Sequence, residues 1–381
     1  MSIVEGKTGI LLLGIVTIGM LAILVVGGSP EPPTTVADFT VCPSGCPYSS
    51  IQEAIDAAPA WTHILVKEGT YTPADGESIT ISKDLILEGE DPEKVIIRGG
   101  AHLRWGSPGY RYSLPIMVIE DAHVVITGFT ISGNWTPQTL SVGDEVGIAI
   151  RGRSDASIFN NHLHNINGTG IVAVDTTQVA IFDNTIRNTY GISIAGRAQA
   201  SIYDDNVITG GRYNPGIFVR QESQARIWGN FVHDNGAIGI QVGQEFYAGT
   251  GWVTFRAMAQ ASIYDNEISS NMLEGIVIAG NGMADILNNR IHHNGWAGVA
   301  VAVTNPAADC NSIQPPYGFD PEYPFKGVLT GWANEVHDNS QGYECRYPGA
   351  EGSALCPPPP AHGLDLCPPD YPWPPGFVKG P

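Results

Sequence analysis

The chain has 381 residues, with 38 Asp and Glu against 19 Lys and Arg, and a formal net charge of −19. Because binding to a phosphate backbone needs clustered cations, this balance argues against a nucleic-acid partner. Apolar residues make up 43% and charged residues 15%, which excludes an intrinsically disordered chain and a charged coiled coil. The 46 Gly and 28 Pro indicate a chain that turns often, so we expect an all-β fold.

The first predicted element is an apolar helix within residues 1–28. Residues 8–28 contain no charged side chain and approach the roughly 20 residues that cross a bilayer. We expect an uncleaved membrane anchor, with a cleaved signal peptide as the alternative. Either one would place the rest of the chain outside the cytoplasm.

Residues 29–47 are predicted to form a Pro-rich linker that ends in a cysteine pair. None of the cysteine spacings is typical of a zinc site, so disulfide bonds are the expected use of these residues. Disulfides require an oxidising compartment, which agrees with an extracytoplasmic location. The six cysteines are Cys42, Cys46, Cys310, Cys345, Cys356 and Cys367.

A short amphipathic helix is predicted over residues 50–58. Ser50 and Glu53 form a capping-box pattern at its start. One helical face is apolar, and it consists of Ile51, Ala54, Ile55 and Ala58. Such a helix would cover one end of a stack of strands, where unpaired edges and apolar interior would otherwise meet water.

Repeats of about 22 residues follow, each with short strands of alternating apolar residues that are broken by Asn and Gly. One Asn or Asp per repeat serves as a register mark, and we expect it in a left-handed bend between two strands. Units of this kind are typical of a single-stranded parallel β-helix, a solenoid, which we predict over residues 48–340. The marks are Asn161, Asn184, Asp205, Asn230, Asn266, Asn289 and Asn334.

Several segments carry a resemblance to a known superfamily. They are Ile51-Gln52 with Ile55 and Ala58-Pro59, VKEGTY from Val66, LILEG from Leu85, and the later Ile-x-x-Asn-x-Ile units. Together they resemble the right-handed parallel β-helix proteins of the pectin-lyase-like superfamily, over about residues 48–339. That superfamily includes polysaccharide lyases and hydrolases, pectin methylesterases, epimerases, copper-delivery accessory proteins and adhesion proteins. The chain lacks the motifs of its polygalacturonases, methylesterases and alginate epimerases, and fold alone does not fix activity.

An aromatic column is predicted on the outside of the coils, two residues before successive marks. Alternation with inward-pointing isoleucines sends these rings outward, and exposed rings suit the faces of sugars. The alternative is that the rings stack on one another and are covered. The substrate-binding candidates are Phe182, Tyr203, Trp228 and Tyr264, together with the nearby cation Arg212.

Three carboxylates fall on neighbouring predicted coils: Asp183, Asp204 and Asp205. They are candidate catalytic acid and base residues for polysaccharide cleavage, with Arg187 assisting. They are also candidate ligands for calcium, which takes oxygen ligands and could bridge the acidic surface to a uronate polymer. The alternative is a structural ladder of Asp and Asn at the coil turns.

A further column, three residues after the marks, contains several histidines. His292 and His337 could share a metal ion if they lie on adjacent coils. The 45-residue step between their marks could instead insert a coil between them, and solvated turn residues are the alternative role. Aromatic insertions are predicted as loops over residues 243–260 and 304–326, and a Pro- and Cys-rich tail over residues 341–381.

The sequence as a whole predicts an extracytoplasmic β-helix protein, secreted or membrane-anchored and monomeric by default, that binds a polysaccharide; if it is an enzyme, we expect a lyase or glycoside hydrolase. Whether it is an enzyme stays open. A non-catalytic surface adhesion or structural protein is one alternative, and a periplasmic metal-binding accessory protein is another.

Overall fold

The structure is a computed structural model. It describes residues 39–74, 77–99, 103–105, 111–113, 115–133, 145–211, 214–243, 245–247, 252–254, 258–301, 328–340, 344–346 and 351–352. The predicted anchor over residues 1–28, the candidate Arg212, the insertion over residues 304–326 and most of the tail lie outside them. The described part of the chain contains no helix that is long and apolar enough to span a membrane.

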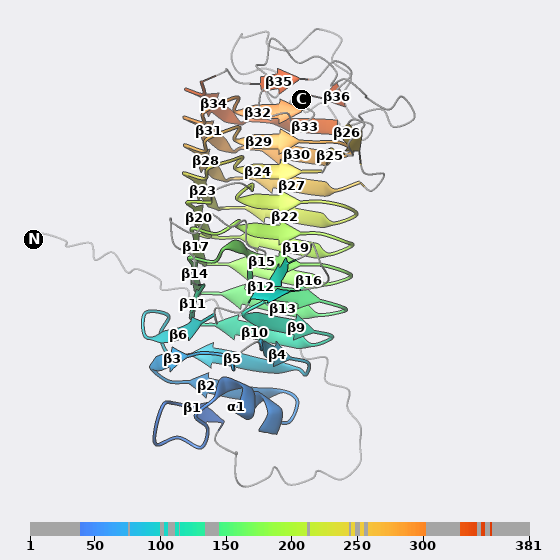
Figure 1. Cartoon of the computed structure of the whole chain (residues 1–381). Helices are drawn as coiled ribbons and strands as arrows, with labels where there is room; N and C mark the ends of the chain where they lie inside the picture. The colour runs from blue at the N-terminus through green and yellow to red at the C-terminus, as the bar shows by residue number, and fades with distance from the viewer. Residues whose placement is uncertain are drawn as a thin grey trace, which may run out of the picture. The chain divides into compact units, whose positions relative to one another are not determined.

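The described strands form a parallel β-helix with three sheets, as predicted (Figure 1). Each coil passes from a strand of sheet A to one of sheet B and then to one of sheet C. Sheet A contains β1 (Thr40–Val41), β2 (Thr62–Val66), β5 (Leu85–Gly89), β10 (His123–Thr127), β13 (Asp155–Phe159), β16 (Gln178–Phe182), β19 (Gln199–Tyr203), β22 (Gln224–Trp228), β27 (Gln260–Tyr264), β30 (Met283–Leu287), β33 (Val328–Trp332) and β36 (Glu351–Gly352).

Sheets B and C complete the coils. Sheet B contains β3 (Gly69–Tyr71), β6 (Val95–Arg98), β11 (Thr130–Ser132), β14 (His162–His164), β17 (Thr185–Arg187), β20 (Val207–Thr209), β23 (Phe231–His233), β28 (Glu267–Ser269), β31 (Arg290–His292) and β34 (Glu335–His337). Sheet C contains β4 (Ile79–Ile81), β9 (Met117–Glu120), β12 (Glu145–Arg151), β15 (Gly168–Ala173), β18 (Ile192–Ile194), β21 (Ile217–Val219), β24 (Ile240–Val242), β29 (Ile276–Ile278), β32 (Val299–Val301) and β35 (Glu344–Arg346). Two hairpins, β7 (Leu103–Trp105) with β8 (Arg111–Ser113) and β25 (Glu245–Tyr247) with β26 (Trp252–Thr254), are antiparallel.

The N-terminal end of the stack is covered by helix α1 (Ile51–Ala57), as predicted (Figure 1). Ser50 is its N-cap, and the Ser50 hydroxyl accepts a hydrogen bond from the Glu53 backbone N–H at 3.5 Å. Ile51, Ala54 and Ile55 are buried against the first coils. A disulfide joins Cys42 to Cys46 directly after β1, so the expected use of this pair is confirmed.

Isoleucine columns form the core of the stack. In sheet A, equivalent isoleucines of adjacent strands pair in register and are fully buried, because alternate residues of a strand point to opposite faces. They are Ile158, Ile181, Ile202, Ile227, Ile263 and Ile286. The period-two pattern therefore predicted correctly which side of each strand faces inward.

The register marks form a buried asparagine ladder at the corner between sheets A and B. The Asn184 side-chain N–H groups donate to the carbonyls of Ile158 and Phe182 at 2.8 Å each and to the Asn206 Oδ1 at 3.0 Å. The same Asn206 oxygen accepts the Asn184 backbone N–H at 3.1 Å. This pattern repeats from coil to coil, so the amides are satisfied although they are buried. The ladder consists of Asn161, Asn184, Asn206, Asn230, Asn266, Asn289 and Asn334.

Two predictions about these marks are wrong. The left-handed bend lies one residue before each ladder asparagine, as at Asn160 (φ 51°) and Asp183 (φ 52°). In the third repeat the ladder residue is Asn206 and not Asp205, because this bend has one extra residue, and both Asp204 (φ 43°) and Asp205 (φ 61°) are left-handed. Asp and Asn tolerate this region better than other non-glycine residues, since their short side chains can hydrogen-bond locally.

Candidate functional site

The predicted aromatic column lies on the outer face of sheet A, at the end of each strand. The rings stack face to face, with centroids 4.9 Å apart for Phe182 and Tyr203, 4.5 Å for Tyr203 and Trp228, and 5.5 Å for Trp228 and Tyr264. Phe159 extends the stack, with its centroid 4.7 Å from that of Phe182. Each inner ring therefore covers the faces of its neighbours and presents mainly its edge. A sugar-binding role for these residues stays a prediction.

The three candidate carboxylates lie at the corner bends between sheets A and B. Asp183, Asp204 and Asp205 are all exposed. Their backbones pair from coil to coil, and the Asp183 N–H donates to the Asp204 carbonyl at 2.8 Å. Within the described residues, no group of three or more His, Cys, Asp or Glu side chains is arranged to hold a metal ion. Catalysis and calcium binding by these residues stay predictions.

The candidate Arg187 lies at the end of β17, on the exposed outer face of sheet B. It pairs in register with His164 of the preceding coil. Burial, and next the charge of Arg187, lower the pKa of His164. No ion pair between Arg187 and Asp183 is found among the described residues. Arg187 thus lies at the opposite end of its strand from the bend that contains Asp183.

A row of glutamines on the outer face of sheet A was missed by the sequence analysis. Gln178, Gln199, Gln224 and Gln260 are the first residues of four successive strands and pair directly with one another in register. All four are exposed, and their side-chain amides make no hydrogen bond within the described part of the chain. We call these residues the glutamine row. Its signal was present in the sequence, because a Gln precedes each of four matching segments, as in QASIY and QARIW.

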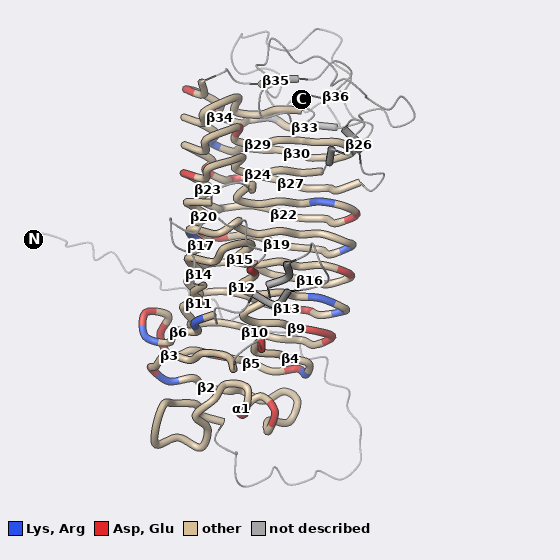
Figure 2. Tube along the Cα trace, in the orientation of Figure 1, with Lys and Arg blue, Asp and Glu red and all other residues tan. Residues whose placement is uncertain are grey.

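The glutamine row lines one side of an open groove with a volume of about 900 Å³. Small side chains such as Ala180, Ser201 and Ser262 form its floor, which keeps the groove shallow and accessible. Its charged lining residues are Asp155, Arg226 and Asp285. In Figure 2 the charged residues of the middle coils lie mostly at the bends, whereas the sheets are largely uncharged. The groove is therefore a long surface of small and amide side chains, with Asp155, Arg226 and Asp285 as its charged residues.

A second group of unusual residues lies on the outer face of sheet C. Ser193 is 6% exposed and its hydroxyl has no hydrogen-bond partner in the described structure. The Arg220 guanidinium lies 5.3 Å from the centroid of the Phe218 ring, and its buried Nε is likewise unpaired. Burial lowers the pKa of Arg220 and raises the pKa of Glu274, which precedes β29. Shifted pKa values of buried groups are typical of functional sites.

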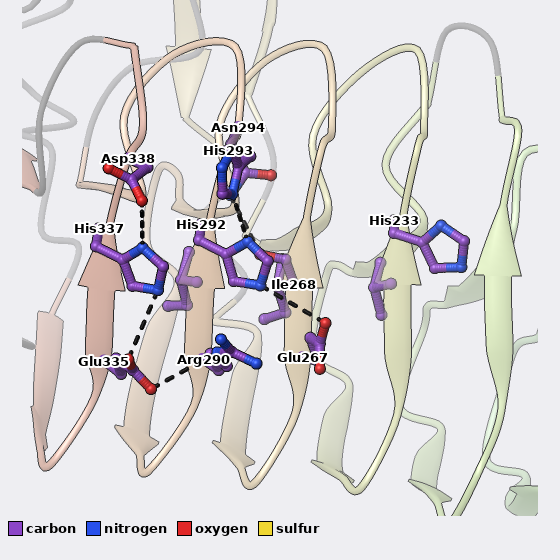
Figure 3. A network of polar contacts seen from close by, with 12 residues as sticks. His233, Glu267, Ile268, Arg290, His292, His293, Asn294, Glu335, His337 and Asp338 are labelled. Carbon is purple, nitrogen blue, oxygen red and sulfur yellow. Dashed lines mark hydrogen bonds and ion pairs between the residues drawn. The ribbon is translucent and has the colours of Figure 1, made fainter.

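The histidine column forms a polar network on sheet B (Figure 3). Strand β31 pairs directly with β34, so the 45-residue step does not insert a coil, and His292 stacks on His337 with centroids 5.1 Å apart. The His337 Nδ1 lies 2.8 Å from Asp338, and the His292 Nδ1 lies 2.7 Å from the Nδ1 of His293. The Nδ1 atoms of His292 and His337 are therefore each occupied by a contact within the network.

Two side chains of this network, His292 and Asp338, have lowered pKa values. Burial, and next the positive charge of Arg290, lower the pKa of His292. The hydrogen bond with His337 lowers the pKa of Asp338. The Nε2 atoms of His292 and His337 lie 3.6 and 3.7 Å from Glu267 and Glu335, too far for a hydrogen bond. Metal sharing between His292 and His337 stays a prediction.

The sequence pattern of the right-handed β-helix region matches residues 110–214 and 188–320, together more than half of the chain. The chain belongs to the right-handed β-helix family. A curated relative of this β-helix protein is the uncharacterized protein YwoF of Bacillus subtilis, which is 30% identical over 131 residues. The match covers 32% of this chain and 26% of YwoF, so the chain spans about a quarter of that relative.

Two solved structures are similar to the β-helix protein. The periplasmic alginate epimerase AlgG is 16% identical with a TM-score of 0.44, and the match covers 80% of this chain and 81% of AlgG. The pectin methylesterase PemA from Erwinia chrysanthemi is 14% identical with a TM-score of 0.47, covering 81% of this chain and 93% of PemA.

Proposed function

We propose that this β-helix protein binds a linear polysaccharide along the outer face of sheet A. The glutamine row supports this proposal above all, because it places four free amides at a regular spacing of about 4.8 Å, the distance between neighbouring strands. Each amide has donors and an acceptor, so each can pair with a sugar hydroxyl. A repeating surface of this kind suits a repeating ligand.

The shape of the groove favours a polymer over a small molecule. Sites for small molecules are enclosed and mostly apolar. The groove along the glutamine row is open, with small residues on its floor and polar side chains along it. A chain of sugars could lie along several coils and contact one amide on each. Affinity would then come from many weak contacts added along the polymer.

We also propose that the protein acts outside the cytoplasm, where polysaccharides are accessible. The Cys42–Cys46 disulfide supports this location, because such bonds persist in oxidising compartments. Alkylation of thiols in protein taken directly from cells, followed by mass spectrometry, tests it. A reduced Cys42 and Cys46 in the freshly lysed cell would contradict an extracytoplasmic location.

The binding proposal is tested by retention of the full chain in native gels that contain neutral glucans, pectate or alginate, with and without calcium. We expect retention by at least one glycan and a large loss of retention in the double variant Gln199→Ala/Gln224→Ala. The matched control is Glu222→Ala, which removes an exposed side chain at the preceding bend, outside the groove. Equal retention of the double variant and the native chain would disprove binding at this face.

A second candidate function is polysaccharide cleavage on sheet C, favoured by the unpaired buried groups there. Glu274 could act as a general acid, because a raised pKa keeps a carboxyl protonated. Assays for reducing ends and for new double bonds distinguish a hydrolase from a lyase. The Glu274→Gln variant should lose turnover but keep retention.

The carboxylates predicted from the sequence give a competing catalytic set. If Asp183, Asp204 and Asp205 act with Arg187, the variant Asp204→Ala should abolish turnover, and removal of calcium should abolish it if calcium takes part. Retention without any turnover would instead favour the non-catalytic adhesion or structural protein. The two catalytic sets are thus separated by the pair of variants Asp204→Ala and Glu274→Gln.

A further inference from the structure

One exposed tryptophan lies at the N-terminal end of sheet A. The Trp61 side chain is 74% exposed, although burying a large ring is strongly favoured. Its backbone is left-handed, with φ 65°, which is rare for a bulky residue. Conformations of this kind persist where the surrounding structure imposes them, and they cluster at ligand-binding sites. Neither the exposure nor the backbone of Trp61 is explained by packing of the core.

The neighbouring coils hold Trp61 in place. Its backbone N–H donates to the Asp84 carbonyl at 2.6 Å. Its ring stacks on the His123 ring, with centroids 6.0 Å apart and planes inclined by 21°. The Asp84 carboxylate in turn accepts the His123 backbone N–H at 2.7 Å and lies 3.0 Å from the His123 Nδ1. The indole is therefore an exposed platform supported from one side.

Trp61 occupies the same outward position as the glutamine row, four strands before Gln178. The strand register aligns Trp61 with Asp84, then His123, Asp155 and Gln178, all at the outward position before or at the start of their strands. Seven strand spacings separate Trp61 from Gln260, which corresponds to about 34 Å at 4.8 Å per strand. An indole platform thus lies on the same line as the row of free amides, about 19 Å before its first member, with Asp84, His123 and Asp155 in between.

The charges on and around this surface favour a neutral polysaccharide over an anionic one. The row has no charged residue from Gln178 to Gln260, and the charged residues that line the groove are two acids, Asp155 and Asp285, against one cation, Arg226. The whole chain carries a net charge of −19. A polyanionic uronate chain would be repelled, whereas a neutral chain needs only hydroxyl partners and an apolar ring face.

We infer that Trp61 forms a sugar-ring subsite beyond the Asp155 end of the proposed groove, on the same line of outward positions, and that the ligand is a neutral glycan. This inference rests on the proposed binding function of sheet A. The indole face packs against one sugar ring, and the Asp84 and His123 pair holds the indole in position. The glutamine row contacts the sugars that follow.

The test is calorimetric titration of the full chain with neutral gluco-oligosaccharides and with oligogalacturonate of equal length. We expect binding of the neutral series only. Trp61→Ala should weaken it about 2- to 13-fold, since an aromatic contact contributes about 0.5–1.5 kcal/mol. Trp61→Phe should keep most of the affinity. The matched control Phe231→Ala, which removes a 41% exposed ring from sheet B, should leave affinity unchanged.

The outcomes separate this inference from the proposed function. Unchanged affinity in Trp61→Ala, together with loss of binding in Gln199→Ala/Gln224→Ala, would overturn the inference and leave the groove intact. Binding of oligogalacturonate alone would also overturn it. Failure to bind any glycan would overturn both. The variant Trp61→Gly removes the ring, and its glycine also relieves the left-handed backbone strain. We expect its thermal unfolding temperature to equal or exceed that of the native chain. That result would show that the fold survives loss of the ring.

Discussion

The asparagine ladder and the glutamine row both carry side-chain amides along this β-helix, and they have opposite roles. The asparagine ladder lies inside the corner between sheets A and B, where Asn206 is fully buried and each amide is paired. The glutamine row lies on the outer face of sheet A, where the amides are exposed and make no hydrogen bond in the described structure. The same chemical group therefore stabilises the fold in one row and is free to bind in the other.

The difference lies in the length of the side chain and the direction in which it points. An asparagine at the corner can reach the carbonyls of its own and the preceding coil, so it replaces hydrogen bonds that the bend leaves unmade. A glutamine at the start of a sheet A strand points away from the core, and the strand already pairs its backbone. Four predictions follow from the largest expected effect to the smallest, and the first and the last test this contrast directly.

The largest effect is expected for the ladder variant Asn206→Ala. It leaves the carbonyls of Ile181 and Tyr203 and the Asn184 amide without their partner inside the corner. Since each buried unsatisfied group costs about 1–3 kcal/mol, we expect a loss of at least about 3 kcal/mol in the free energy of unfolding. Chemical denaturation measures it. The control Asn188→Gly alters an exposed left-handed bend and should cost far less.

The ring stack is expected to give the next largest effect. Tyr203→Ala removes two stacking contacts, at 4.9 and 4.5 Å, and should destabilise the fold by about 1–3 kcal/mol. Tyr264→Ala removes one stacking contact, at 5.5 Å, and should cost about half as much. Thermal unfolding of both variants gives the comparison. Equal losses at the two positions would show that stacking contributes little.

A pH-dependent effect is expected at Glu274. Its pKa is raised by burial, so the folded state binds this proton more tightly than the unfolded state does. Stability therefore falls as pH rises from the ordinary glutamate value of about 4.3 through the raised folded pKa. Glu274→Gln, which carries no charge, should be more stable than the native chain at pH 7 and lose this advantage below about pH 4. A difference that does not vary with pH would contradict the burial of this carboxyl.

The smallest effect on stability is expected in the glutamine row. Gln199→Ala/Gln224→Ala should change the free energy of unfolding by less than about 0.5 kcal/mol, because exposed residues without partners contribute little. Chemical denaturation under the conditions used for Asn206→Ala gives a direct comparison. A large destabilisation would show that these amides support the coils and would remove the main argument for a binding role.

Much of this fold could be predicted from the sequence. The repeat length, the period-two isoleucines and the capping pattern at Ser50 are local features, and each produces the same structure wherever it occurs. The stacking of Phe182 on Tyr203 was one of two alternatives that followed from the spacing of the repeats. The choice between stacking and exposure depended on how closely the coils approach, which sequence spacing does not report.

The candidate site was harder to predict. In the sequence, Asp205 occupies the place of a register mark, because a one-residue insertion in a bend shifts the alignment by one position, and only the hydrogen bonds of Asn206 reveal it. The glutamine row was visible as repeated letters, but a Gln at the start of a strand is equally compatible with an ordinary solvated surface. The buried groups near Arg220 and Glu274 had no signal in the sequence.

The sequence by itself determined that this chain winds into stacked coils, since periodic burial is a property of consecutive residues. Only the tertiary structure decided which polar side chains are satisfied and which are free. That distinction depends on residues from neighbouring coils, 22 to 45 positions apart along the chain, whose atoms meet only after the coils stack.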